Sequence, residues 1–135
     1  IMPVPLQMAD FSSTISFFGM TSQVLDFFES QSSQAKRYWF KKLLMVRAGH
    51  DSGSQSLEGM MRGLFSGDLL QHAIVESTAV SRAAQQFRSL YEMADSDAAI
   101  KRARKSYDAA FEEIEALMHQ AWRDMSAEDK RRRAE

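Results

Sequence analysis

Cysteine is missing from this sequence of 135 residues, and its two prolines, Pro3 and Pro5, both lie in the first five positions. Without cysteine the chain can form no disulfide bond, no thiolate zinc site and no cysteine nucleophile. The absence of proline from residue 6 onward favours helices, because turns and loops often contain proline. The scarcity of these two residue types therefore predicts a helical protein without thiol chemistry.

A strong net charge and long apolar runs are missing too. The formal net charge is −1, so attraction to nucleic acid or to an anionic membrane has to come from a local patch. No apolar run approaches the roughly 20 residues that cross a bilayer. The first residues, IMPVPLQMADF, lack the basic start and the apolar stretch of a signal peptide. We therefore expect a cytoplasmic or otherwise intracellular protein.

Apolar residues at helical spacing are what the chain does contain. Two stretches, 68–94 and 97–124, each carry one apolar face, and a shorter helix is expected at 56–65. The region 9–48 predicts one helix, or two or three shorter ones. Its main apolar stripe follows steps of three, four or seven residues through Phe11, Ile15, Phe18, Leu25, Phe28, Ala35, Trp39, Leu43 and Val46.

The clearest interruption is the Gly- and Ser-rich stretch 48–56, where Ser54 or Ser56 can cap the helix that follows. Within it, residues 51–56 read DSGSQS. These six residues resemble the DSG-x-x-S motif that F-box ubiquitin ligases read after double phosphorylation. The resemblance implies a loop open to modification, and a plain flexible connection is the alternative.

Short connections between amphipathic helices favour antiparallel neighbours. The predicted fold is therefore all-α, an antiparallel bundle of four to five helices with a short extended N-terminus. Residues 1–8 are expected to form an extended lead-in. Residues 9–125 form a single helical-bundle domain, and residues 126–135 form a short basic helix or tail. The chain length suits one domain.

The stretch KRYWFKK, residues 36–42, places three aromatic residues between two pairs of cations. On a helical wheel Trp39 falls within the main apolar stripe, whereas Phe40 and Tyr38 fall on opposite flanks. A helix that is apolar on several sides is usually covered on several sides. The wheel therefore assigns Trp39 to the core. The flanks either belong to the core as well, with the cations extending past the aromatic rings to water, or meet a partner, another subunit or a lipid surface. Stacking on nucleic acid is a third interpretation.

We accordingly predict a non-enzymatic interaction protein, an adaptor, accessory or assembly subunit that binds a protein partner or itself. Aromatic residues and methionine are enriched at the centres of protein interfaces. Phe17 and Phe27 also fall beside the main stripe. The residues predicted to bind the partner are Tyr38, Phe40, Leu44, Met45, Met60 and Met61.

The alternative function is polyanion binding, to nucleic acid or to an anionic membrane surface. Three basic segments, 36–47, 101–105 and 130–133, would have to meet on one face. Complementary packing of charged helices explains the same segments without a ligand. The residues predicted to bind a polyanion are Lys36, Arg37, Lys41, Lys42, Lys101, Arg102 and Lys105.

No catalytic site can be assembled from the sequence motifs. The run GHDSGS, residues 49–54, contains His, Asp and Ser, but neighbouring residues cannot fold back into a nucleophile-base-orienter geometry. The metal candidate is two pairs one helical turn apart, His72 with Glu76 and Glu115 with His119. Solvated side chains are the simpler interpretation of these pairs. We therefore predict no enzyme, no cofactor, no metal and no small-molecule substrate.

Overall fold

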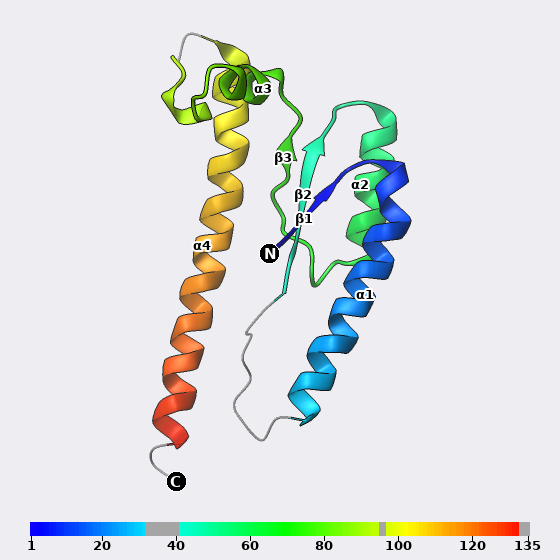
Figure 1. Ribbon diagram of the computed structural model, residues 1–135, viewed down its shortest axis with the longest axis vertical. Helices are drawn as coiled ribbons and strands as arrows, with labels where there is room; N and C mark the ends of the chain where they lie inside the picture. Colours follow the sequence, from blue (N-terminus) through cyan, green and yellow to red (C-terminus); the bar gives the residue numbers. More distant parts are fainter. Residues whose placement is uncertain (32–40, 95–96, 133–135) are drawn as a thin grey trace.

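Helices cover both faces of a small parallel sheet in the computed structural model, which describes residues 1–31, 41–94 and 97–132 (Figure 1). The strands are β1 (Met2–Pro5), β2 (Leu43–Ala48) and β3 (Ile74–Val75), in the order β1-β2-β3. The α-helices are α1 (Met8–Gln31), α2 (Ser52–Leu64), α3 (Thr78–Gln85) and α4 (Ala98–Arg132). A short 3-10 helix, η1 (Leu90–Glu92), lies between α3 and α4.

The prediction of an all-α antiparallel bundle is therefore wrong, because the described residues contain three parallel strands. The main error is β2, where Leu, Met and Ala favour helix by propensity. A strand covered on both faces has no alternation of apolar and polar residues, so its sequence resembles a buried helix segment. The expected helix at 68–94 is also replaced, by β3, α3 and η1.

Two right-handed crossovers explain why α1 and α2 share one face of the sheet. Each helix connects neighbouring parallel strands in the same direction across the sheet, so both pack on the same side. The side chains of Leu43 and Met45 point into this layer, where they meet Phe18 of α1 and Met61 of α2. This cluster forms the larger part of the core.

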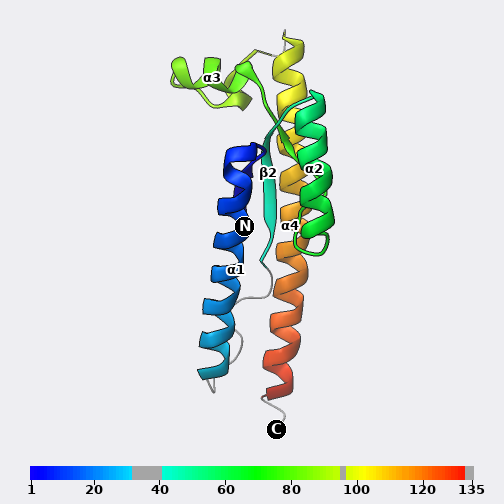
Figure 2. The same cartoon turned by 90° about the vertical axis from the view of Figure 1, so that its right-hand side faces the viewer.

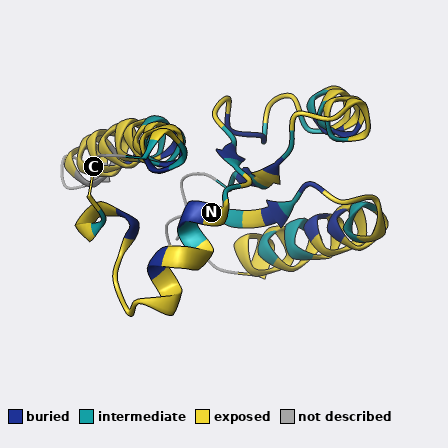
Figure 3. Ribbon diagram, turned by 90° about the horizontal axis from the view of Figure 1, so that it is seen from above, coloured by how far each residue is buried: buried dark blue, intermediate teal, exposed yellow. Residues whose placement is uncertain are grey.

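The opposite face of the sheet is covered by α4 (Figures 1 and 2). Leu44 of β2 and Ile74 of β3 pack against Ala110, with Ile114 and Leu117 beside them. The helix continues without interruption to Arg132, past position 126, where a short basic helix or tail was expected to begin. Seen from above, α4 is buried along one side and exposed along the rest (Figure 3).

An irregularity in β2 lies at Arg47, which has a φ of 58°. Side chains alternate between the two faces up to Val46, but the pairing with β3 shifts between Val46 and Ala48. The shift leaves Arg47 as an extra, unpaired residue in β2, as in a β-bulge. Ala48 therefore packs in the same layer as Leu43 and Met45. None of the described helices is long and apolar enough to cross a membrane.

Candidate interaction surfaces

Helix α1 has a second apolar face in addition to the one that packs on the sheet. Phe18 is buried and meets Phe65 edge to face, with 5.2 Å between the ring centroids. At about 100° per residue, Phe17, Met20, Val24, Phe27 and Phe28 fall on an arc roughly 100° wide, well away from Phe18. All five are exposed, Phe27 by 60% and Phe28 by 64%. We call these five residues the α1 stripe.

The charged residues of helix α1 itself are all acidic. Helix α1 carries Asp10, Asp26 and Glu29 and no basic residue. Two of these acids lie near the C-terminus of the helix, where the helix dipole disfavours negative charge. On the helical wheel Asp26 and Glu29 lie about 100° beyond the two edges of the α1 stripe, so the stripe itself is uncharged.

The predicted partner-binding residues are only partly available at the surface. Leu44, Met45 and Met61 are buried in the two clusters that sandwich the sheet, so they do not form a surface of this chain. Met60 is exposed. Tyr38 and Phe40, together with Trp39, lie outside the described residues.

Helix α3, η1 and the first turns of α4 form a second unit at one end of the molecule (Figure 1). Its apolar centre consists of Ala79, Leu90, Ile100 and Ala103. Arg104 ties the unit together, because its guanidinium donates to the carbonyls of Leu90 (3.0 Å), Tyr91 (3.1 Å) and Met93. This unit, residues 78–107, is called the α3–α4 end below.

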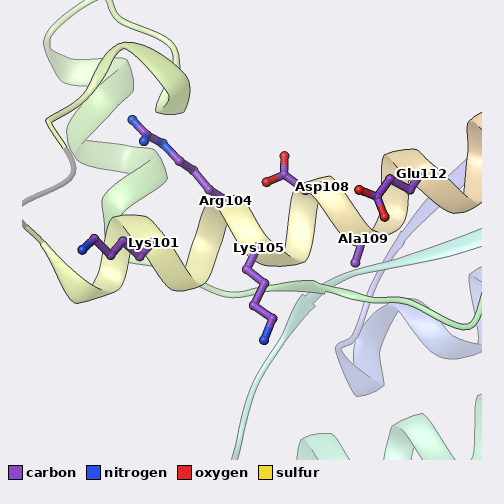
Figure 4. A pocket seen from close by; sticks show the side chains of 6 residues that line it. All are labelled: Lys101, Arg104, Lys105, Asp108, Ala109 and Glu112. Carbon is purple, nitrogen blue, oxygen red and sulfur yellow. The ribbon is translucent and has the colours of Figure 1, made fainter.

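The start of α4 carries a cluster of cations. Between residues 98 and 107 there are four basic residues and no acid, whereas residues 108–115 contain four acids and no base. Figure 4 shows the two halves along one open hollow, with Lys101, Arg104 and Lys105 followed by Asp108 and Glu112. Within the described part of the chain, no acid forms an ion pair with Lys101, Arg102 or Lys105.

The other predicted cations do not join this cluster. Lys41 lies 4.5 Å above the Phe18 ring and contacts the Ser22 hydroxyl, and Lys42 donates to the Gly67 carbonyl. Both lie just before β2, and β2 runs toward the α3–α4 end (Figure 1). The two lysines are therefore at the other end of the strands from the α3–α4 end. Lys130 is more than seven helical turns beyond Lys101. Lys36 and Arg37 lie outside the described residues.

Phe87 is the most exposed apolar side chain of the α3–α4 end. Helix α3 ends in a Schellman motif, in which Arg88 N–H donates to Ala83 O and Phe87 N–H donates to Ala84 O, both at 3.0 Å. The motif places Phe87 in the left-handed region, with a φ of 54°. Glycine usually occupies this position, because a Cβ atom is disfavoured there. The Phe87 side chain is 100% exposed.

Arg47, the other non-glycine residue with positive φ, is held by internal partners. Its guanidinium lies 3.1 Å from a carboxylate oxygen of Glu76, which follows β3. On its other side is Gln7, which follows β1, and with the Gln7 amide turned so that its oxygen faces Arg47 the contacts are 3.0 and 3.1 Å. Arg47 thus connects the carboxyl ends of all three strands.

The loop that resembles a DSG-x-x-S motif has a structural role. Asp51 caps α2 by accepting hydrogen bonds from the Ser54 N–H (2.9 Å) and the Ser54 hydroxyl (2.7 Å). The Ser54 hydroxyl is the main cause of the lowered pKa of Asp51, and the Ser54 N–H adds to it. The serines at 52, 54 and 56 therefore begin α2 rather than a loop.

The four residues of the metal candidate do not meet. His72 Nδ1 lies 2.9 Å from Glu113, whereas Glu76 pairs with Arg47. His119 is 3.5 Å from Glu115 on the same helix. Among the described residues, no group of three or more histidines and acids could hold a metal ion.

The sequence pattern gave only a partial signal for these surfaces. Phe17 and Phe27 were found beside the main stripe, but Phe28 was assigned to the stripe itself and is exposed. Phe87 fell on the apolar face of the expected helix 68–94, whereas α3 ends at Gln85, two residues before Phe87. The sequence contains no glycine, asparagine or proline near Phe87 to mark this helix end.

Comparison with known proteins gives two curated relatives. One, from Rhizobium rhizogenes, is named "Putative replication protein A" and is 29% identical over 119 residues, covering 86% of this chain and 30% of the relative. The other, from Sinorhizobium fredii, has the same name and is 29% identical over 119 residues, covering 86% of this chain and 29% of the relative. The chain thus spans less than a third of the length of these relatives. No family model matches it.

Proposed function

We propose that this chain is a non-enzymatic association module of a replication protein, and that it binds a protein partner through the α1 stripe. The observation that carries the proposal is the second apolar face of α1, with five large apolar side chains exposed on one helix. Contiguous exposed apolar patches of this kind mark interaction sites. The link to replication is supported by the name that both relatives carry.

The expected partner surface is apolar. Three phenylalanines of the α1 stripe supply the large apolar area that dominates interface energetics. Phe27 and Phe28 also contact each other edge to face, with 6.0 Å between their ring centroids. This contact already restricts the two side chains, so binding costs less side-chain conformational entropy. A second copy of this chain is one possible form of such a partner.

Two variants test this function. Replacing Phe27 and Phe28 together by serine should abolish association, seen as loss of co-purifying protein and of any oligomer in sedimentation velocity. Replacing Phe111, an exposed aromatic residue of α4, by serine is the matched control and should leave association unchanged. Equal association by both variants and the unmodified chain would exclude the α1 stripe as the binding surface.

A second candidate function is polyanion binding at the α3–α4 end. The observation that favours it is the run of four cations at the start of α4, where the positive end of the helix dipole adds to their charge. Exchange of Lys101 and Arg102 for glutamate should weaken binding to single-stranded DNA and flatten its salt dependence. Unchanged binding, or no binding by the unmodified chain, contradicts this function.

A further inference from the structure

We propose that Phe87 is a nucleobase-stacking residue, whose ring receives a base of a nucleic acid strand while the cations at the start of α4 hold the phosphates. The proposal rests on the second candidate function, polyanion binding, and adds a specific contact to it. The inference starts from Phe87 itself, which combines a left-handed backbone with a fully exposed aromatic ring.

The Schellman motif explains the backbone conformation of Phe87, but no contact within the described molecule explains why a phenylalanine occupies this position. The Schellman motif at the end of α3 needs a residue with positive φ, and glycine or asparagine meets that need without strain. The phenyl ring is fully exposed and packs in none of the three apolar clusters. Strain that persists without an internal contact is typical of binding sites.

Phe87 belongs to the same structural unit as the cation cluster. Phe87 is three residues from Leu90, so their Cα atoms are separated by at most about 11 Å. Leu90 is bound to α4 directly, through the hydrogen bond from Arg104 and the apolar contact with Ile100 and Ala103. The ring therefore projects from the same unit that presents Lys101 and Arg102.

Charge favours a nucleic acid over an acidic or neutral protein as the occupant. Residues 78–107 contain six basic residues and three acids, so the unit has a net positive charge. Asp97 pairs with Arg82, whereas Glu92 remains an anion that accepts the N–H of Ser89 at 2.6 Å. Hydrogen bonds from Ser89, the main cause, and the charge of Arg88 lower the pKa of Glu92. The cations of this unit can bind a phosphate backbone. An exposed aromatic ring can stack on any of the bases.

The test compares two probes with the same phosphates, labelled oligothymidylate and an abasic oligonucleotide of equal length. Phe87→Gly should lower the affinity for oligothymidylate about 5- to 150-fold and leave the abasic probe unaffected. Phe87→Trp should retain the affinity for oligothymidylate. Phe111→Ser, which removes an exposed ring elsewhere, is the matched control and should change neither affinity.

The outcomes separate this inference from the function on which it rests. If Phe87→Gly changes both affinities equally or neither of them, Phe87 does not stack on a base, although polyanion binding stands. If the unmodified chain binds neither probe, polyanion binding fails and the inference fails with it. If Phe87→Gly removes a co-purifying protein and leaves DNA binding intact, the ring occupies a protein pocket and the inference is overturned.

Discussion

The α1 stripe and the α3–α4 end are both exposed, but they differ in charge and in shape. The stripe is a row of apolar side chains on a helix that has acids and no bases. The α3–α4 end has the fully exposed ring of Phe87, and its helix α4 begins with four basic residues, of which Arg104 is bound to backbone carbonyls of the unit. Large apolar contacts suit protein association, whereas isolated rings among cations suit nucleic acid. The difference shows how one short chain can present surfaces of two chemistries.

The largest effect is expected from the two neighbouring phenylalanines of α1. Phe18→Ala removes a buried ring and should lower the free energy of unfolding by about 3–5 kcal/mol. Phe17→Ala removes an exposed ring of the stripe and should change it by less than about 0.5 kcal/mol. Urea unfolding measures both. Similar losses at the two positions would mean that α1 has one apolar face rather than two.

The methionine pair of α2 should repeat this contrast on a smaller scale. Met61 is 1% exposed and Met60 is 47% exposed. Met61→Ala should cost about 2–5 kcal/mol of stability, while Met60→Ala should be nearly neutral. Thermal and urea unfolding are suitable measurements. A costly Met60→Ala with a neutral Met61→Ala would contradict the packing of α2 on the sheet.

Glu113 connects the sheet layer to α4, and its loss should have an intermediate effect. Its carboxylate accepts the N–H groups of Gln71 (2.8 Å) and His72 (3.0 Å) and contacts the His72 ring at 2.9 Å. Glu113→Gln should lower the free energy of unfolding by about 1–3 kcal/mol. Glu115→Gln, at an exposed position of the same helix, is the control and should be close to neutral.

The pH dependence of this contact has a definite sign. Burial raises the pKa of Glu113, but the hydrogen bonds from Gln71 and His72 outweigh it, so the pKa lies below the ordinary value of 4.5. The contribution of Glu113 is therefore present above that value and is lost as the pH falls through the lower pKa of the folded state. The unmodified chain should lose stability in this acidic range more steeply than Glu113→Gln. If the stability of the unmodified chain and of Glu113→Gln fell equally with pH, Glu113 would not contribute to stability in this way.

The smallest change in the free energy of unfolding is expected at Phe87, and there the substitution should stabilise the protein. Phe87→Asn should raise the free energy of unfolding by about 0.5–1 kcal/mol, because asparagine tolerates the left-handed conformation. The substitution separates stability from binding, since we expect it to strengthen the fold and weaken stacking. A loss of stability would show that the Phe87 ring supports the α3–α4 end.

Helix α4 could be predicted from the sequence because it packs along one side and is exposed along the other. Its apolar spacing and the acids before residue 98 marked its start correctly to within a residue. The strands could not be predicted in this way. Leu43, Leu44 and Met45 are buried on alternating faces, so β2 has no polar face to reveal its period.

The candidate surfaces could be predicted only where the helical spacing of apolar residues is enough to identify them. Phe17 and Phe27 deviate from the main stripe in any helical wheel, so part of the α1 stripe was visible. The exposure of Phe28 could not be predicted, because the sequence does not show which of the two apolar faces of α1 packs on the sheet. Phe87 depends on the end of α3, and helix ends are set by local capping that propensity describes poorly.

The central claim is that the α1 stripe contacts protein, and photo-cross-linking tests it most directly. A benzophenone side chain placed at position 27 should cross-link to protein, whereas the same group at position 87 should cross-link to nucleic acid. The two positions share one chain and one fold, so each serves as the control for the other. Cross-links from position 27 to nucleic acid alone, or to nothing, would contradict the account.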